Sequence, residues 1–184
     1  MRLVCLDPGH GGRDPGACYG KVRESEIALR FAQRLGHYIR ANGGRTAFTR
    51  EDDRFVSLFN RGQVAKLAKA DLFVSIHCNA ASTSAARGCE AFYAAPDKNP
   101  TRSIAWARVS LHTIAGICAI PIRGVKPDNA SQHKSLTVLR STYSSMPAIL
   151  LELGFLTNNY DRAAITNTRN LENLAASLGR KMAS

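Results

Sequence analysis

The sequence predicts a single α/β domain in which a twisted, mostly parallel sheet of about six strands carries helices on both faces. Short apolar runs of four to eight residues alternate with longer segments of helical periodicity, as in βαβ folds. The 184 residues, 45% of them hydrophobic, suffice for one core, since a domain of this size buries roughly 70% of its unfolded-chain surface. No internal repeat or linker divides the chain, so we expect one domain over residues 1–184.

Six short apolar segments are expected to form the strands. Each has a strand's length and is bounded by polar or turn-forming residues. The predicted strands are residues 2–7, 45–50, 71–79, 89–95, 136–139 and 148–153.

Four segments show helical periodicity. The first is the clearest, because Ile27, Phe31, Leu35 and Ile39 recur every fourth residue and an Asn-Gly-Gly sequence follows. Residues 119–135 contain two prolines and little periodicity, which predicts a long surface loop. The other predicted helices are residues 57–69, residues 100–118, and a last one carrying Leu171, Leu174, Leu178 and Met182.

Composition limits the environment and the partners. The net charge of +11 implies an anionic partner, although a solvated basic surface is the alternative. The sequence has no apolar run of about 18 residues, and its first residues do not have the pattern of a signal segment. We therefore expect no membrane span and synthesis in the cytoplasm. The five widely spaced cysteines form no CxxC pair, so buried thiols are expected.

Polar residues stand at the carboxyl ends of three predicted strands. The first strand leads to His10, the third contains His77 and the last contains Glu152. Burying such groups without a partner costs several kcal/mol. Ligands of open parallel sheets bind beyond the carboxyl ends of the strands. We therefore expect these three side chains to share a partner.

A zinc ion would be such a partner, because two histidines and one glutamate are a known ligand set that leaves a fourth position open for water. The third ligand beside His10 and His77 must then come from elsewhere in the chain. Glu24, at the start of the first helix, can reach back across the glycine-rich loop toward His10, whereas Glu26 faces elsewhere. The dispersed spacing is weak evidence by itself. A loop histidine at position 10 and a core histidine at position 77 remain the alternatives.

Five sequence blocks add a resemblance that covers essentially the whole chain. Through these blocks the sequence resembles the zinc-dependent N-acetylmuramoyl-L-alanine amidases, which include bacterial autolysins, division amidases and phage endolysins. The blocks occur in the same order as in that family. The resemblance implies zinc ligands His10, Glu24 and His77, one ion per chain, and a catalytic Glu152; the short segment before Glu24 leaves Glu26 as the alternative ligand. The blocks are LDPGHGGRDPGA at 6–17, RESEIALRFA at 23–32, TRxxD at 49–53, ADLFVSIHCNA at 70–80 and MPAILLELGFLTN at 146–158.

The resemblance implies a peptidoglycan hydrolase that cuts the amide between N-acetylmuramic acid and L-alanine. Zinc would lower the pKa of its bound water to about 7 and polarise the carbonyl. Glu152 would take the proton of that water and pass it to the departing nitrogen. Anionic wall polymers would account for the positive charge. We expect a monomer that acts on the cell wall after lysis or pore formation.

Other interpretations stay open at this point. The same ligands suit a zinc peptidase or another zinc amide hydrolase. A nucleic-acid-binding module would explain only the charge, and the chain lacks an aromatic platform, so no nucleic acid is expected as partner. Glu152 could instead pair with Arg140. Asn79 and Arg140 could bind a peptide and its carboxylates, or act as scaffold.

Access to the site also depends on the loops. In some division amidases of this family, an inserted helix after the strand equivalent to residues 89–95 plugs the zinc site. Here only residues 96–99 precede the next predicted helix, too few for a plugging helix. We expect an open site; if a loop does cover it, residues 119–135 are the first candidate for such a lid. His133 in that segment is either a substrate contact or a plain surface residue.

Overall fold

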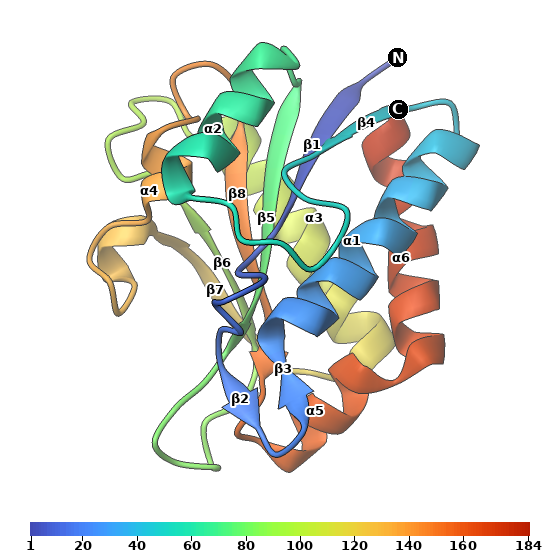
Figure 1. Ribbon diagram of the computed structural model, residues 1–184, viewed down its shortest axis with the longest axis vertical. Coiled ribbons are helices and arrows are strands. Elements are labelled where there is room, and N and C mark those ends of the chain that lie inside the picture. The colour runs from blue at the N-terminus through green and yellow to red at the C-terminus, as the bar shows by residue number, and fades with distance from the viewer.

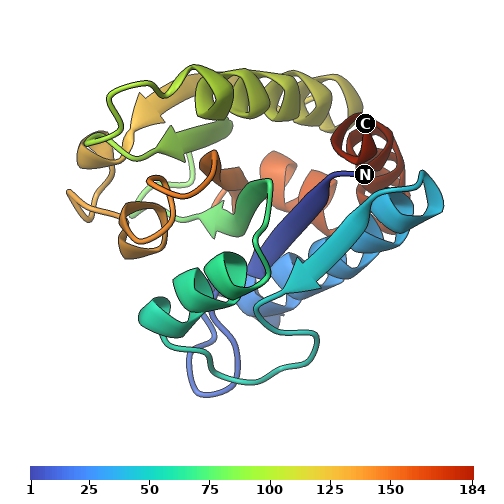
Figure 2. The same ribbon diagram turned by 90° about the horizontal axis from the view of Figure 1, so that it is seen from above.

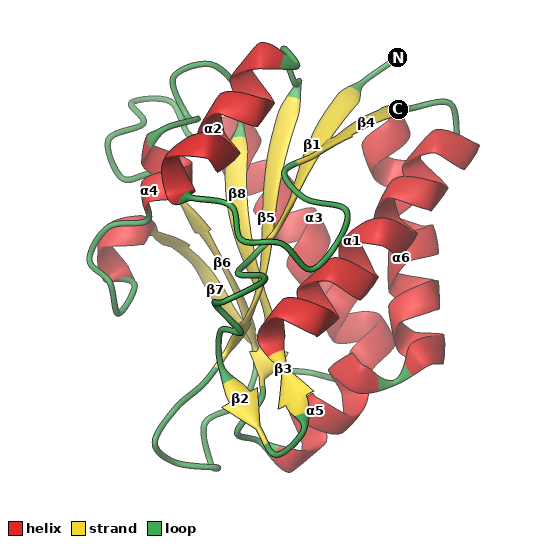
Figure 3. Ribbon diagram, viewed as in Figure 1, coloured by secondary structure: helices red, strands yellow, loops and turns green.

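The computed structural model describes residues 1–184 and has a six-stranded sheet at its centre with helices on both faces (Figures 1 and 3). The strands are β1 (Leu3–Pro8), β2 (Cys18–Tyr19), β3 (Val22–Arg23), β4 (Arg45–Phe48), β5 (Leu72–Asn79), β6 (Cys89–Tyr93), β7 (Ile122–Pro127) and β8 (Ala148–Phe155). The helices are α1 (Glu24–Ala41), α2 (Leu58–Leu67), α3 (Thr101–Cys118), the 3-10 turn η1 (Asp128–Ala130), α4 (Thr137–Arg140), α5 (Asn159–Thr166) and α6 (Thr168–Ala183).

The strands follow the order β4-β1-β5-β8-β6-β7. The first four are parallel to one another. β6 runs antiparallel to β8, and β7 is parallel to β6. The predicted, mostly parallel sheet is therefore confirmed. The carboxyl ends of β1, β5 and β8 and the first residues of β6 lie at the same end of the sheet, and the polar candidate residues lie there too.

The core lies in two layers. The larger cluster of buried apolar side chains packs between the sheet and α1, α3 and α6, and the smaller one packs under α2 and α4. Figure 2 shows the two chain ends close together, beside α6. No helix combines the length and the apolar character that crossing a lipid bilayer requires.

Two predicted elements are wrong. Residues 136–139 do not form a strand; they lie mostly in α4, where Val138 and Leu139 are buried in the smaller core cluster. The sixth strand is β7, inside the segment predicted as a loop. β7 lies at the sheet edge and its residues are exposed or half-buried, so it lacks the apolar run that marks a buried strand. The sequence interpretation also missed α5 and the small β2–β3 hairpin.

Candidate metal centre

The loop after β1 carries His10 with its backbone in the left-handed region, at φ 60°. Glycine is needed beside it for space. A side chain on Gly9 would overlap the His77 ring, and one on Gly16 would overlap the Glu24 carboxylate and the His10 ring. The missing side chains let backbone and functional groups approach closely.

A fully buried arginine holds this loop. Arg50, just after β4, donates hydrogen bonds to the carbonyls of Pro8, Gly9, Ser25 and Asp52, at 2.7–3.0 Å. These carbonyls belong to the glycine-rich loop, to the first turn of α1 and to the segment after β4. One planar guanidinium thus joins the loop that carries His10 to the helix that carries the acidic ligand candidate.

A buried carboxylate fixes the end of β1 from the other side. Asp7 accepts hydrogen bonds from Thr49 Oγ1 at 2.6 Å, Ser75 Oγ at 2.7 Å and Arg61 Nη1 at 2.8 Å. Arg61 also donates through Nη2 to the carbonyl of His10 at 2.7 Å. The charge of Asp7 is therefore paired and hydrogen-bonded, as burial requires.

The predicted ligand set converges on one point. Glu24 Oε1 lies 3.1 Å from His10 Nε2 and 2.9 Å from His77 Nδ1, and one ligand atom of each residue can be chosen so that all lie within 4.8 Å of one another. Asp14 Oδ2 lies 2.9 Å from His10 Nδ1, the nitrogen turned away from this point. Glu26, the alternative ligand, is exposed and lies near Arg23 instead.

The surroundings keep Glu24 ionised. Burial alone would raise the pKa of Glu24, but hydrogen bonds with His10 and His77 outweigh it, and the pKa lies well below its usual value. Burial lowers the pKa of His10, and the carboxylates of Glu24 and Asp14 reverse this and raise it. Two nitrogens and one ionised oxygen, with a carboxylate behind one histidine, are a donor set that fits zinc.

Glu152 lies beside this set. It is the register partner of His77 across β5 and β8. Its Oε2 atom is buried without a hydrogen-bond partner, and burial raises the pKa of Glu152 well above its usual range, an effect that Glu24 and Glu90 reinforce. A buried carboxylate oxygen without a partner needs an explanation, and an acid–base role beside a metal would supply one.

The remaining polar candidates, Arg140 and Asn79, each contact a carboxylate outside the ligand set. Arg140 ends α4 and pairs with the buried Asp128, through Nε at 2.7 Å and Nη2 at 3.0 Å, so the structure brings it to neither Glu152 nor the ligand set. Asn79 ends β5 and donates from Nδ2 to Glu90 at 2.6 Å. Cys78 is buried on the opposite face from His77, as the strand alternation predicts.

Two neighbouring hollows give access to the centre. One, of about 480 Å³, is lined by His10, Asp14 and His77, and the next, of about 280 Å³, adds Glu24 and Glu152. His133 lines both hollows, Gln132 lines the smaller one and Ser135 the larger one, so these three residues border the site. The segment between β6 and α3 contains no helix, as predicted.

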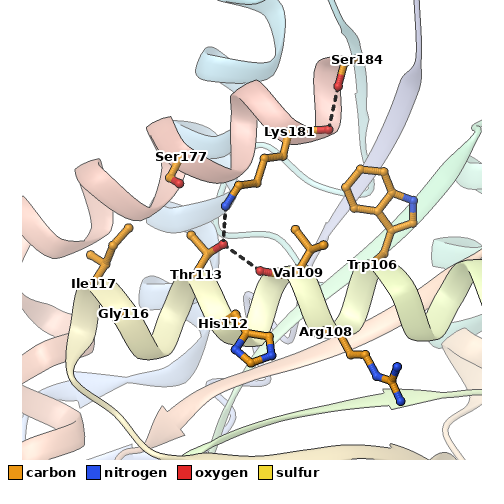
Figure 4. A pocket seen from close by; sticks show the side chains of 10 residues that line it. All are labelled: Trp106, Arg108, Val109, His112, Thr113, Gly116, Ile117, Ser177, Lys181 and Ser184. Atoms are coloured by element: carbon orange, nitrogen blue, oxygen red, sulfur yellow. Dashed lines mark hydrogen bonds between the residues drawn. The ribbon is translucent and has the colours of Figure 1, made fainter.

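A larger hollow of about 820 Å³ lies between α3 and α6 (Figure 4). Trp106, His112 and Lys181 line it, and Lys181 Nζ donates to Thr113 Oγ1 at 2.9 Å. No carboxylate side chain lines this hollow. It therefore lacks the acidic ligand that the candidate centre at the carboxyl ends of the strands has.

Fold and site together define a class: a single α/β domain with a candidate catalytic metal centre at the carboxyl ends of its strands. Residues 4–183 match the family described as N-acetylmuramoyl-L-alanine amidase, and the chain belongs to this family.

Relatives and solved structures agree with this family. The amidase LytC of Bacillus subtilis is 34% identical over 167 residues, which are 88% of this chain and 31% of LytC. The endolysin of Bacillus phage SPP1 is 36% identical over 165 residues, or 89% of this chain and 58% of the endolysin. The catalytic domain of CwlV from Bacillus (Paenibacillus) polymyxa is 32% identical with a TM-score of 0.85, covering 98% of this chain and 95% of that one. The chain thus corresponds to part of the two longer relatives.

Arg50 generates the first prediction. Replacing Arg50 by Met should lower the free energy of unfolding by about 3 kcal/mol, because the buried hydrogen bonds to Gly9 and Ser25 are lost and the Pro8 carbonyl keeps only Arg61 as a side-chain donor. Denaturant unfolding measures this. Arg45→Met, at an exposed arginine on the neighbouring strand, is the control and should change it by less than about 0.5 kcal/mol. Equal effects of the two variants would contradict the role of Arg50.

Asp128 generates a prediction for pH. Burial would raise the pKa of Asp128, but hydrogen bonds from Arg140 and from two backbone N–H groups lower it. Its stabilisation is therefore present above its unfolded pKa, near 4, and is lost as the pH falls through the lower folded value. Asp128→Asn should destabilise the fold by about 1–3 kcal/mol at pH 7.

The difference between wild type and Asp128→Asn should shrink in melting experiments as the pH falls below about 4. Asp52→Asn, at an exposed aspartate, is the matched control and should show little difference at any pH. A deficit for Asp128→Asn that stays constant down to acid pH would contradict this assignment.

Proposed function

We propose that residues 1–184 are a zinc-dependent N-acetylmuramoyl-L-alanine amidase domain. The observation that carries the proposal is the convergence of His10, Glu24 and His77 on one point, with the unpartnered carboxylate of Glu152 beside it. The family supports the choice of bond, the amide between N-acetylmuramic acid and L-alanine in peptidoglycan.

The ligand residues hold their places without rearrangement. His10 Nε2, His77 Nδ1 and Glu24 Oε1 already face one another, and Asp14 fixes the ring orientation of His10 from behind. We propose that these atoms hold one zinc ion per chain. When bound, zinc supplies Lewis acidity, which brings the pKa of water near 7 and polarises a carbonyl.

Glu152 moves the proton in this proposal. Burial, with Glu24 and Glu90 nearby, raises the pKa of Glu152, which suits a carboxyl group that accepts a proton from water and then passes it on. The acceptor of that proton is the alanine nitrogen, since an amine leaves poorly unless it is protonated. The bond between the carbonyl carbon and this nitrogen breaks, and the water oxygen becomes part of the new carboxylate.

The wider setting belongs to the same proposal. Peptidoglycan is the substrate, and the net charge of +11 would favour a surface of anionic wall polymers. We propose that the domain acts as a monomer at the bacterial cell wall, which it reaches after lysis or pore formation.

Digestion of purified peptidoglycan, with and without a chelator, tests the function. The expected products are free stem peptides with new alanine amino termini, identified by mass, and none should form with the chelator. New amino termini on other residues would show a peptidase and overturn the choice of bond.

Zinc binding and hydrolysis should both depend on His10 and His77. His10→Ala and His77→Ala should each lose bound zinc in elemental analysis and lose hydrolysis. Chelation should also lower the melting temperature of the wild type, because the ion joins β1, α1 and β5. His37→Ala, at an exposed histidine of α1, should keep its zinc. Full activity of metal-free protein would refute the zinc assignment.

Glu152→Gln should keep zinc and the fold, yet lower kcat about 10²- to 10⁴-fold, because the amide cannot carry the proton. Glu26→Gln, at an exposed glutamate, is the matched control and should keep its rate. Elemental analysis decides the alternative: zinc lost in Glu152→Gln would make Glu152 a ligand.

A further inference from the structure

Two cations reach the neighbourhood of Glu152 from β7, in the segment that sequence analysis predicted to be a loop. Lys126 Nζ lies 2.5 Å and Arg123 Nε 3.3 Å from the same atom, Glu90 Oε2. Asn79 Nδ2 donates to the other carboxylate oxygen, Glu90 Oε1, at 2.6 Å. One carboxylate thus stands between two cations, and the group keeps a net positive charge.

The pleat of the sheet places this group next to the proposed proton carrier. Glu90 is the direct register partner of Glu152 across β6 and β8. Side chains that face each other on antiparallel strands have Cβ atoms about 4.5–5.5 Å apart and lie on one face. The hollow of about 270 Å³ at this place is lined by Glu152, Asn79, Glu90, Arg123 and Lys126. It shares Glu152 and Asn79 with the hollow over the ligand set.

The two cations have donors to spare. The Lys126 ammonium carries three N–H groups and has one hydrogen bond, to Glu90. Arg123 donates from Nε to Glu90 and from Nη1 to the Arg87 carbonyl, which leaves its Nη2 atom without a partner. The side chains are 33% and 39% exposed, so a ligand in the hollow can contact them.

We propose that Arg123 and Lys126 bind the carboxylate of the stem-peptide residue that follows L-alanine. This inference rests on the proposed amidase function. An extended peptide spans at most about 3.3–3.6 Å per residue. A carboxylate one residue beyond alanine therefore lies about 7 Å from the nitrogen that Glu152 protonates. This is between one and two strand spacings of about 4.8 Å, and the cations of β7 reach toward Glu90 on β6, the strand next to β8.

The bound carboxylate would share the two cations with Glu90. Charge-assisted hydrogen bonds of this kind are stronger than neutral ones. An amide at the same position of the stem peptide would offer one oxygen without charge and would place an N–H group against cations. The pair would therefore favour stem peptides with a free carboxylate over amidated ones.

The test uses two muropeptides that differ only at the second stem residue, which carries either a free carboxylate or its amide. With zinc-loaded wild type, kcat/KM should be about tenfold higher for the carboxylate. Lys126→Gln and Arg123→Gln should bring this ratio close to one, mainly by raising KM for the carboxylate substrate. Lys126→Arg should restore most of the preference, and Lys98→Gln, at an exposed lysine, should leave it unchanged.

The outcomes separate the two proposals. Equal rates of wild type on both substrates would overturn this inference and leave the amidase function standing, whereas cleavage of neither would overturn the function itself. A uniform loss on both substrates in Lys126→Gln would show a structural role through Glu90. Because that variant leaves Glu90 with fewer partners, Lys126→Gln combined with Glu90→Gln is measured as well. This double variant should also lose the preference, and a retained preference would refute the site.

Discussion

The hydrogen bonds of one buried guanidinium are the constraint on which the candidate centre depends. At the end of β1 the chain enters the glycine-rich loop, and the buried carbonyls of this stretch, which include those of Pro8 and Gly9, accept hydrogen bonds from side chains. Each such group would cost about 1–3 kcal/mol if unpaired. Arg50 satisfies two of them and also the Ser25 carbonyl at the start of α1. Because a guanidinium is planar and rigid, Arg50 links the backbone next to His10 to the backbone next to Glu24, while Arg61 holds the carbonyl of His10 itself.

Within that frame, the same chemical group has two opposite environments. Glu24 receives hydrogen bonds from two imidazoles and from the Cys78 N–H, so its pKa falls and it remains an anion. Glu152 has a buried oxygen without a partner and carboxylates nearby, so its pKa rises. The surroundings thus move the pKa values of the two carboxylates in opposite directions, which fits the proposed roles of Glu24 as ligand and Glu152 as proton carrier.

The sequence predicted the buried parts of this molecule well, because burial leaves a periodic apolar pattern. β1, β5, β8 and α1 were predicted for that reason, and the candidate site residues His10, His77, Glu152 and Glu24 lie on these elements or, for His10, just after one. Elements at the edge were not: β7 is half-exposed and has no such pattern, and α4 is a single turn whose apolar residues imitate a strand. The partner of Arg140 could not be read either, because Asp128 comes beside it only through the fold.

The missed strand β7 matters because it runs parallel to β6, and β6 is reversed relative to β8. If β6 were parallel to β8, its last residues would lie at the end of the sheet that carries the candidate centre, and β7 would run in the same direction. The reversal at β6 instead brings its first residues there, with Glu90 opposite Glu152. β7, parallel to β6, then contributes the long side chains of Arg123 and Lys126. In the proposed enzyme the strands have different roles: the loop after β1 and the end of β5 carry the two histidine ligands, β8 carries the proton carrier, and the reversed strands supply the positive charge that would bind the peptide.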